Sequence, residues 1–384
     1  MIEHYKLPPN WEVVPFERIA ADTKYPIGDG DHGSIKPSCY GTKGIPYIRV
    51  ADLVDGDISK AEMVFIPHEV HRANPKSHLY PGDILISKTG ATIGKVAIIS
   101  DNIPEANTTA SVGKITVNKQ IAFTRFVYWY MTTTLFQSQM WRVSIKSAQP
   151  GFNIENMKKF LIPLPPLPEQ KRIAAIMDKA DAIRRKRQQA IKLAADFLYA
   201  TFLDMFGDPV TNPKGWKSST IGELIKVKSG NFLPANKMRE GEIPVYGGNG
   251  INGFHDAYMF DSPVLVIGRV GVYCGVIHKT EPKSWVTDNA LYVAERSEDV
   301  TDLYLEWALR MANLNQYASQ AGQPLISGGR IYPVEINVPP LNLQRQFENI
   351  QISYFKMRKI LLASSGEGNE LFDSITQRAF RGEL

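Results

Sequence analysis

The sequence contains the same series of short motifs twice, in the same order. The four matching pairs are Asn10-Trp11 with Gly215-Trp216, Lys88-Thr89-Gly90 with Arg269-Val270-Gly271, Gln149-Pro150 with Gln323-Pro324, and residues 162–167 with residues 336–341. The copies lie 174 to 205 residues apart, whereas solenoid repeats recur every ~20–50 residues. The repeat therefore predicts a duplicated domain, with two copies that differ mainly in the lengths of their loops.

Each copy has a globular part followed by a helical part. In the globular parts, short apolar runs with β-branched residues are separated by Gly, Pro, Asn and Asp, which is typical of strands. Residues 84–86 and 264–267 are examples of such runs. Residues 124–141 and 301–318 instead carry apolar and aromatic residues at helical spacing, so one helix is expected in each segment.

The regions 166–207 and 339–384 are each predicted to form a long helix, which leaves 1–165 and 208–338 as the two globules. Pro168 suits the first helical turn, where its missing N–H costs nothing. Apolar residues then recur alternately every three and four positions, which is the a/d pattern of a coiled coil. The predicted seam positions include Ile173, Ile176, Ala180, Ile183 and Phe197 in the first helix, and Phe347, Ile350, Tyr354, Met357 and Leu361 in the second.

The two apolar stripes are expected to bury each other as an antiparallel pair. The alternative is that each helix packs only on its own globule. An unbroken first helix would be about 57 Å long at 1.5 Å per residue, while Gly366 and Gly368 predict a kink or a break in the second. The predicted fold class is α/β in the broad sense (α+β), with two similar globular domains joined by a long antiparallel two-helix coiled coil.

The composition excludes several classes of protein. Cys39 and Cys274 are the only cysteines in 384 residues, so a disulfide framework is impossible and a reducing compartment is expected. No run approaches the ~20 apolar residues of a membrane helix, and the first residues show no signal-peptide pattern, so no membrane association is expected. The net charge of +5 favours a polyanionic partner.

Several strings resemble nucleotide-binding or catalytic motifs but lack an essential feature. Residues 28–33 and 248–253 match the dinucleotide fingerprint without a following helix, so both are interpreted as flexible loops. Residues 90–96 are one spacer residue short of a phosphate-binding loop, and residues 68–71 are one residue short of a zinc-protease motif. No catalytic residue and no metal ligand is therefore assigned, which favours a binding protein over an enzyme.

The candidate DNA-binding residues are cations in glycine-rich turns and the amide, hydroxyl and aromatic groups near them. Lys and Arg neutralise phosphates, while Asn, Gln and Arg recognise base edges in the major groove. Lys88 and Arg269 are favoured, because both copies place a cation at the same point before a glycine. The full set is Lys88, Thr89, Lys95, Asn107, Thr108, Gln149, Tyr246, Asn249, Arg269, Lys279, Asn289 and Gln323. The basic run at residues 184–187 fits either a solvated helix face or a phosphate-facing stripe.

Five strings resemble the specificity subunits of type I restriction-modification systems: residues 164–173, 205–209, 212–216, 243–251 and 379–384. The resemblance covers essentially the whole chain. It implies two target-recognition domains, each of which recognises one half of a split double-stranded DNA sequence in the major groove. It also implies that the helical regions set the gap between the halves and dock two methyltransferase subunits. At the start of the second helix the chain departs from the pattern, since Asn342-Leu343-Gln344 stands where the first has Pro168-Glu169-Gln170.

The resemblance further implies that the chain has no chemistry of its own. The assembled complex, with restriction (translocase) subunits added, would methylate adenine or cleave unmodified DNA in a prokaryotic cytoplasm. S-adenosylmethionine, ATP and Mg²⁺ are then expected on the partner subunits and not on this chain. Three alternatives stay open: a specificity subunit of a modification-only system, a self-contained DNA methyltransferase or nuclease, and a coiled-coil scaffold that binds only protein.

Overall fold

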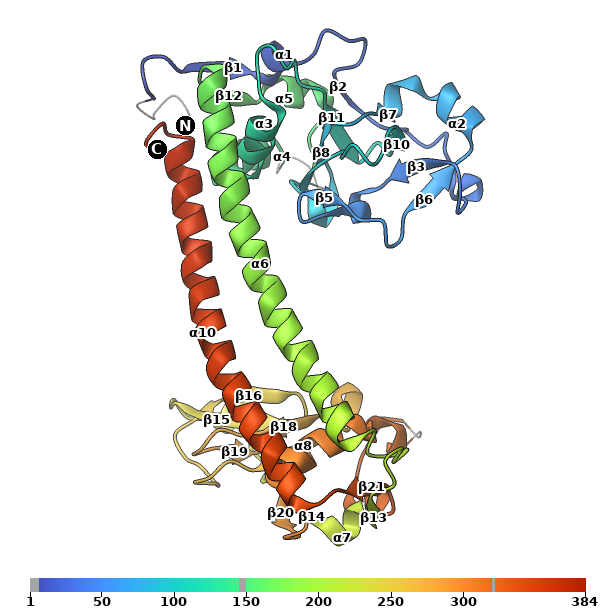
Figure 1. Cartoon of the computed structure of the whole chain (residues 1–384), viewed down its shortest axis with the longest axis vertical. Coiled ribbons are helices and arrows are strands. Elements are labelled where there is room, and N and C mark those ends of the chain that lie inside the picture. The colour runs from blue at the N-terminus through green and yellow to red at the C-terminus, as the bar shows by residue number, and fades with distance from the viewer. Residues whose placement is uncertain (1–6, 145–149, 320–321) are drawn as a thin grey trace. The chain divides into compact units, whose positions relative to one another are not determined.

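The computed structural model describes residues 7–144, 150–319 and 322–384. The chain forms two compact units: unit 1 comprises Met1–Arg187 with Ser364–Leu384, and unit 2 comprises Gln188–Ala363. Each unit therefore contains one globular repeat and a part of each long helix, α6 (Leu167–Phe206) and α10 (Leu341–Ala379) (Figure 1).

The strands of unit 1 form two four-stranded sheets and two short antiparallel pairs. The first sheet has the order β2 (Ile27–Asp29), β11 (Val112–Ile115), β8 (Ile84–Ser87) and β9 (Val96–Ile98). The second has the order β6 (Val64–Ile66), β3 (Ile45–Ile48), β10 (Ala106–Thr108) and β7 (His78–Leu79). The pairs are β1 (Glu12–Pro15) with β12 (Leu161–Leu164), and β4 (Leu53–Val54) with β5 (Asp57–Ile58).

The strands of unit 2 repeat this arrangement. One sheet has the order β14 (Ile225–Ser229), β20 (Ala290–Arg296), β17 (Leu265–Gly268) and β18 (Ile277–Lys279). The other has the order β16 (Gly250–His255), β15 (Ile243–Gly247) and β19 (Trp285–Val286). The first and last strands, β13 (Lys217–Thr220) and β21 (Glu335–Val338), pair with each other as β1 and β12 do.

The strand order shows that the sequence repeat is a structural duplication. In both units the four-stranded sheet joins its members in the same antiparallel order. In both units the second sheet contains one parallel contact at the equivalent place, β10 with β3 and β15 with β19. The predicted duplication and the α+β class are confirmed, and among the described residues unit 1 differs by the additional strands β4, β5 and β7.

Short helices cover the sheets of each unit. Those of unit 1 are α1 (Phe16–Ile19), α2 (His68–Ala73), α3 (Thr124–Thr132), α4 (Thr134–Ser144) and α5 (Ile154–Lys159), and those of unit 2 are α7 (Ile221–Leu224), α8 (Asp302–Met311) and α9 (Gly328–Ile331). The single helix expected at 124–141 is wrong, because Thr133 is extended and its hydroxyl accepts the Phe136 N–H at 3.2 Å. The helix expected at 301–318 likewise ends at Met311, since Asn313 is left-handed and a 3₁₀ turn follows.

The aromatic core of each unit includes the ends of the two long helices. In unit 1, Phe380 lies near the end of the chain, and its ring is 5.2 Å from Phe126 and 5.6 Å from Tyr130 of α3. In unit 2, Phe202 of α6 lies 5.3 Å from Phe347 of α10 and stacks on α8. Burial of rings of this size stabilises a domain by several kcal/mol each. The long helices are therefore integral parts of both cores.

In each unit α6 and α10 run antiparallel and touch one another, as predicted, and each also packs on the globule. In unit 1, Met177 contacts Thr376 and Arg184 covers the ring of Phe372. The globule is contacted as well, because the indole N–H of Trp129 donates to Asp178 at 2.8 Å. The predicted helix pair is therefore confirmed, and the alternative that each helix packs only on its own globule is wrong, although packing on the globule is present as well.

The predicted phase of the coiled-coil seam is wrong at three positions. Ile183 is 53% exposed, Phe197 62% and Met357 44%. The residues that turn inward instead are Asp181, Leu198 and Gln351. A strict heptad assumes a single partner helix, but α6 and α10 also bury a face against their globules, so the inward stripe follows the straight-helix period of 3.6 more closely. The remaining seam positions are buried or half-buried: Ile173, Ile176, Ala180, Phe347, Ile350, Tyr354 and Leu361.

The predicted break at the two glycines of the second helix is absent, because α10 continues from Leu341 to Ala379. Gly368 has a packing role. The Arg187 side chain crosses it, and its Nη1 donates to the Ser364 carbonyl at 2.9 Å. A Cβ at Gly368 would lie 2.1 Å from that nitrogen, whereas a Cβ at Gly366 would meet nothing within 4 Å.

Candidate nucleic-acid interface

Each unit has a hairpin, β8–β9 in unit 1 and β17–β18 in unit 2, which we call the central hairpin. A cation follows the first strand of this hairpin at the same place in both units. Lys88 comes directly after β8 and Arg269 directly after β17. The N–H of Lys88 donates to the Ser111 carbonyl at 2.8 Å, and that of Arg269 donates to the Asn289 carbonyl at 3.0 Å. Because β11 and β20 begin near these carbonyls, the two cations occupy equivalent backbone positions at one end of the four-stranded sheet.

The two cations have different surroundings. Lys88 is 5% exposed, and its ammonium is ion-paired with Asp29 at the end of β2. Arg269 is half-buried, and its Nη1 donates to the Ser229 hydroxyl at 3.0 Å and to the Asp288 carbonyl at 3.3 Å. Within the described parts of the chain, no carboxylate lies within 4.0 Å of the Arg269 guanidinium. The charge is therefore neutralised in unit 1 and left uncompensated in unit 2.

Other predicted residues of unit 2 gather around Arg269. Asn249, Asn289 and Gln323 are all exposed. The Asn289 carbonyl lies 3.3 Å from the position of a Cβ at Gly248, and the Gln323 amide lies 3.6 Å from that of a Cβ at Gly271. The turn between β15 and β16, the start of β20 and the loop before α9 thus meet at the end of β17. We call Arg269 together with Asn249, Asn289 and Gln323 the strand-end surface of unit 2.

Besides Lys88, three more of the predicted residues lie inside the protein. Asn107 and Thr108 are fully buried in β10, which runs between β3 and β7, and the Thr108 hydroxyl donates to the Ile48 carbonyl at 2.7 Å. Tyr246 is 5% exposed, and its hydroxyl accepts the Glu281 N–H at 3.1 Å. Since these polar groups are used within the fold, the structure gives them no free edge for a nucleic acid.

The remaining predicted residues are spread over both units. Thr89 is half-buried and Lys95 is exposed near the same end of β8, while Gln149 lies outside the described residues. Lys279 is at the opposite end of the sheet from Arg269, because it pairs with Leu265 at the start of β17. Lys279 therefore belongs to β18 and not to a glycine-rich turn, and it lies away from the strand-end surface of unit 2.

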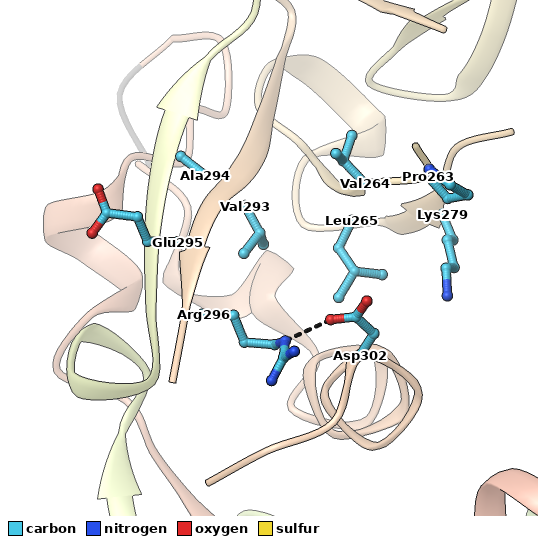
Figure 2. A pocket seen from close by; sticks show the side chains of 9 residues that line it. All are labelled: Pro263, Val264, Leu265, Lys279, Val293, Ala294, Glu295, Arg296 and Asp302. Carbon is cyan, nitrogen blue, oxygen red and sulfur yellow. Dashed lines mark ion pairs between the residues drawn. The ribbon is translucent and has the colours of Figure 1, made fainter. Parts of the chain in front are cut away.

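Lys279 borders a small polar pocket of unit 2. The pocket has a volume of about 160 Å³ and also contains Arg296 and Asp302, which form an ion pair at 2.6 Å. Figure 2 shows Lys279 and Arg296 on either side of Asp302. Because a carboxylate already occupies the space between the cations, this pocket is a poor site for a phosphate.

Two loops that the sequence suggested to be flexible are ordered. In the first, Asp31 accepts N–H groups of Gly33 and Ile35, each at 2.9 Å. Burial opposes the charge of Asp31, but hydrogen bonds from Ser34 and from the backbone outweigh it and lower the pKa of the carboxyl. In the second, residues 250–253 belong to β16, which pairs with β15.

The sequence alone does not indicate that Asp29 is the partner of Lys88. The sequence does contain one signal next to Asp29: Gly30 and Gly230 occupy equivalent positions in the two repeats. A Cβ at Gly30 would lie 2.1 Å from the Thr108 carbonyl oxygen, and one at Gly230 would lie 2.3 Å from that of Val286. Both glycines allow the backbone to pass equally close to another stretch of backbone, so they add a fifth matching point to the four that the sequence repeat shows.

The basic run of α6 is largely engaged within unit 1. Arg184 and Arg185 both form ion pairs with buried Asp181, each at 2.6 Å. Arg185 also donates to the Asp55 carbonyl, and Arg187 bonds Ser364 of α10. These contacts order the arginines against the protein, which neither of the two predicted interpretations had included.

The described residues contain no group of three or more His, Cys, Asp or Glu side chains arranged to hold a metal ion. No helix in the parts of the chain covered by the structure is long and apolar enough to cross a membrane.

The fold and the strand-end cations define a class of protein: a duplicated recognition protein whose two globules share a pair of long helices. The family model for the type I restriction modification DNA specificity domain matches residues 38–193 and again residues 213–361. The chain therefore belongs to this family and carries its domain twice, and its role is DNA recognition in a type I restriction-modification system.

Similar proteins agree with this assignment. The chain is 27% identical over 288 residues to the specificity subunit of the type I restriction enzyme EcoprrI from Escherichia coli, with 69% of each chain covered. It is 23% identical over 396 residues to the EcoKI specificity subunit from Escherichia coli strain K12, with 88% of this chain and 82% of the other covered.

Two solved structures share the fold. A chain from a structure concerning complex assembly and conformational transition of the type I restriction-modification system aligns with a TM-score of 0.62 at 18% identity, covering 99% of this chain and 100% of the other. The S subunit of the type I system from M. genitalium aligns with a TM-score of 0.61 at 14% identity, covering 98% and 96%.

Proposed function

We propose that unit 1 and unit 2 each recognise one half of a bipartite duplex DNA target, in the major groove. The observation that carries the proposal is the duplicated sheet order with a cation at the same strand end in both units. Duplication of a fold supplies two similar recognition surfaces, and the different side chains on them allow two different half-sites. The names of the relatives, which are specificity subunits, support the same conclusion.

Two joined recognition domains also solve an energetic problem. Each base pair discriminates by about 1–3 kcal/mol, so a single short site gives limited specificity. When two domains are held at a fixed spacing, the second binds as an intramolecular event and the contributions of the two half-sites combine. In this proposal α6 and α10 set that spacing, because their ends are built into both hydrophobic cores.

The chemistry belongs to partner subunits in this proposal. Two methyltransferase subunits dock on the helical regions and bind S-adenosylmethionine, and restriction (translocase) subunits use ATP and Mg²⁺. This chain supplies recognition and no catalytic residue. A modification-only system is the same proposal without the restriction subunits.

A domain exchange tests the proposal. Residues 10–150 are replaced by the corresponding segment of another member of the family, and the chimera is assembled with its methyltransferase subunits. Methylated adenines are then mapped across a genome that expresses the complex. We expect one half of the methylated motif to change while the other half and the gap stay the same.

A reciprocal exchange of residues 215–335 should change the other half. If either exchange altered both halves, two independent recognition domains would be the wrong description. The chain alone, incubated with DNA and S-adenosylmethionine or Mg²⁺, serves as the control. Methylation or cleavage by the chain alone would indicate a self-contained enzyme instead.

A further inference from the structure

A turn at the end of the central hairpin has the same backbone in both units. It contains the 3₁₀ turn η5 (Gly90–Thr92) in unit 1 and η7 (Gly271–Tyr273) in unit 2. Three backbone hydrogen bonds of the turn match between the units. The N–H of Gly90 donates to the Pro150 carbonyl at 3.2 Å, and that of Gly271 donates to the Pro324 carbonyl at 2.9 Å. The other two pairs are Gly94 to Ser87 (2.9 Å) and Gly275 to Gly268 (2.8 Å), and Lys95 to Thr92 and Val276 to Tyr273 (both 3.2 Å).

Glycines at both ends of the turn determine this backbone. Gly90 and Gly271 have φ of 78° and 79°, and Gly94 and Gly275 have φ of 88° and 87°. L side chains rarely adopt this left-handed region. The flanking residues therefore fix the turn, while the residues between them are free to differ.

The side chains at the tip of the turn do differ. Unit 1 has Ala91 and Thr92, whereas unit 2 has Val272 and Tyr273. Val272 is 86% exposed and Tyr273 is 48% exposed. Large apolar groups held out on a rigid turn contribute little to folding, so their exposure points to a binding partner.

The neighbours of η7 show what that partner is. Arg269, two residues before the turn, has a guanidinium with no carboxylate within ion-pair distance among the described residues. The exposed amides of the strand-end surface lie beside it. An uncompensated cation suits a phosphate, amides suit base edges, and apolar groups suit the thymine methyl in the major groove. The combination fits duplex DNA better than an apolar protein surface.

We propose that the η7 turn is the base-contacting element of unit 2, with Val272 and Tyr273 as specificity-determining residues and Arg269 as the adjoining phosphate contact. This inference rests on the proposed function. Unit 1 presents the same turn with the smaller side chains of Ala91 and Thr92 beside a neutralised lysine, so the two units recognise their half-sites with different chemistry on one backbone.

The test replaces the tip of η7 by that of η5, as the double variant Val272→Ala with Tyr273→Thr. The variant is assembled with the methyltransferase subunits, and bound sequences are selected from duplexes randomised in both half-sites. Preference at one or two positions of the unit 2 half-site should relax by roughly 5- to 150-fold, as expected for lost base contacts. The unit 1 half-site should not change.

Two further variants separate the roles. Arg269→Gln should lower the slope of log K against log salt by about 0.9 and leave the preferred bases unchanged. Val210→Ala removes a 41% exposed apolar side chain from the loop between α6 and β13 in the same unit, and it should leave every base preference unchanged.

Unchanged half-site preference in the double variant would overturn the inference. So would a variant that keeps its preference but no longer assembles with methyltransferase subunits, because the tip would then be a protein contact. The exchange of residues 215–335 distinguishes failure of this inference from failure of the proposed function. If that exchange changes the half-site and the tip variant does not, only this inference fails. If neither changes it, the proposed function fails as well.

Discussion

A buried glutamine near the start of α10 ties the helix to its globule, and its removal should destabilise unit 2. Gln344 is fully buried. Its Oε1 accepts the N–H of Thr301, the residue that caps α8, at 2.7 Å. Its Nε2 donates to the carbonyls of Pro339 and Asp299 at 2.8 and 2.9 Å. One side chain thus joins the starts of α8 and α10 and the strand end before α10.

The expected cost follows from these three bonds. In Gln344→Met the side chain keeps its length and helix propensity but loses both polar groups. Each buried group left without a partner costs about 1–3 kcal/mol. The groups left without a partner are the Thr301 N–H and the carbonyls of Pro339 and Asp299. Because the two carbonyls keep some access to other donors, the total cost is in the lower part of the range for three groups, about 3–5 kcal/mol. For a unit of this size, 1 kcal/mol shifts the melting temperature by about 2–4 °C, so a fall of roughly 6–20 °C is expected.

Urea unfolding followed by tryptophan fluorescence measures the loss, and hydrogen exchange at the start of α8 locates it in unit 2. Gln346→Met is the matched control, because Gln346 is exposed on the same helix and should change stability by less than about 0.5 kcal/mol. Gln170→Met gives an independent repeat in unit 1, where Gln170 accepts the Phe123 N–H at 2.7 Å. A loss below about 1 kcal/mol in Gln344→Met, or an equal loss in the control, would refute the reasoning.

Three further predictions concern the helices and the pH response. In urea unfolding, Phe202→Ala should lower the free energy of unfolding by about 3–5 kcal/mol and Phe197→Ala by less than about 0.5 kcal/mol, because Phe202 is fully buried while Phe197 faces solvent. Equal losses would mean that Phe197 is a buried seam residue, as the heptad pattern predicted. Gly366→Ala should raise the free energy of unfolding by about 0.5–1 kcal/mol, and Gly368→Ala should raise it less, because the new Cβ at residue 368 displaces the Arg187 side chain. A larger gain for Gly368→Ala would contradict the packing of Arg187 over Gly368. Burial, followed by the neighbouring His78, lowers the pKa of His71 below its ordinary 6.5, so the native state binds fewer protons than the unfolded chain, and unit 1 should lose stability as pH falls below about 6.5. His71→Gln should flatten this dependence between pH 7.5 and 5.5 even though Glu105 opposes the shift, and an unchanged slope would assign it to another group.

Local and repeated signals in the sequence were sufficient for much of the fold. The apolar runs around residues 84–86 and 264–267 form β8 and β17, and the proline strings precede α6 and α10 as expected. The motif pair Gln149-Pro150 and Gln323-Pro324 marks equivalent loops, because Pro150 and Pro324 accept matching N–H groups from the two turns. Signals of this kind depend on short stretches of chain, so a single sequence contains them.

Non-local contacts account for what the sequence did not predict. Lys88 is a residue type that contacts phosphates, and only the fold shows that Asp29, 59 residues away in the sequence, neutralises its charge. Asn107 is buried because β10 lies between two other strands, and no local pattern specifies its neighbours. The seam of α6 shifted at Phe197 for the same reason, since packing on the globule competes with the partner helix.

The internal duplication allows residues that maintain the fold (the frame) to be distinguished from residues that contact the target (the contacts), because each position can be compared with its equivalent in the other unit. Residues that keep the same role in both units are buried or conformationally special, such as Gln170 with Gln344 and the glycines that bound η5 and η7. Positions that are equivalent but chemically different lie at the strand ends, where Asp29 faces Lys88 and Ser229 faces Arg269. A protein that must recognise two different half-sites with one fold requires this division, because the frame has to fold identically while the contacts have to diverge. The uncompensated charge of Arg269 is therefore the expected consequence of divergence at a contact position, and unit 2 should account for more of the salt dependence of DNA binding than unit 1.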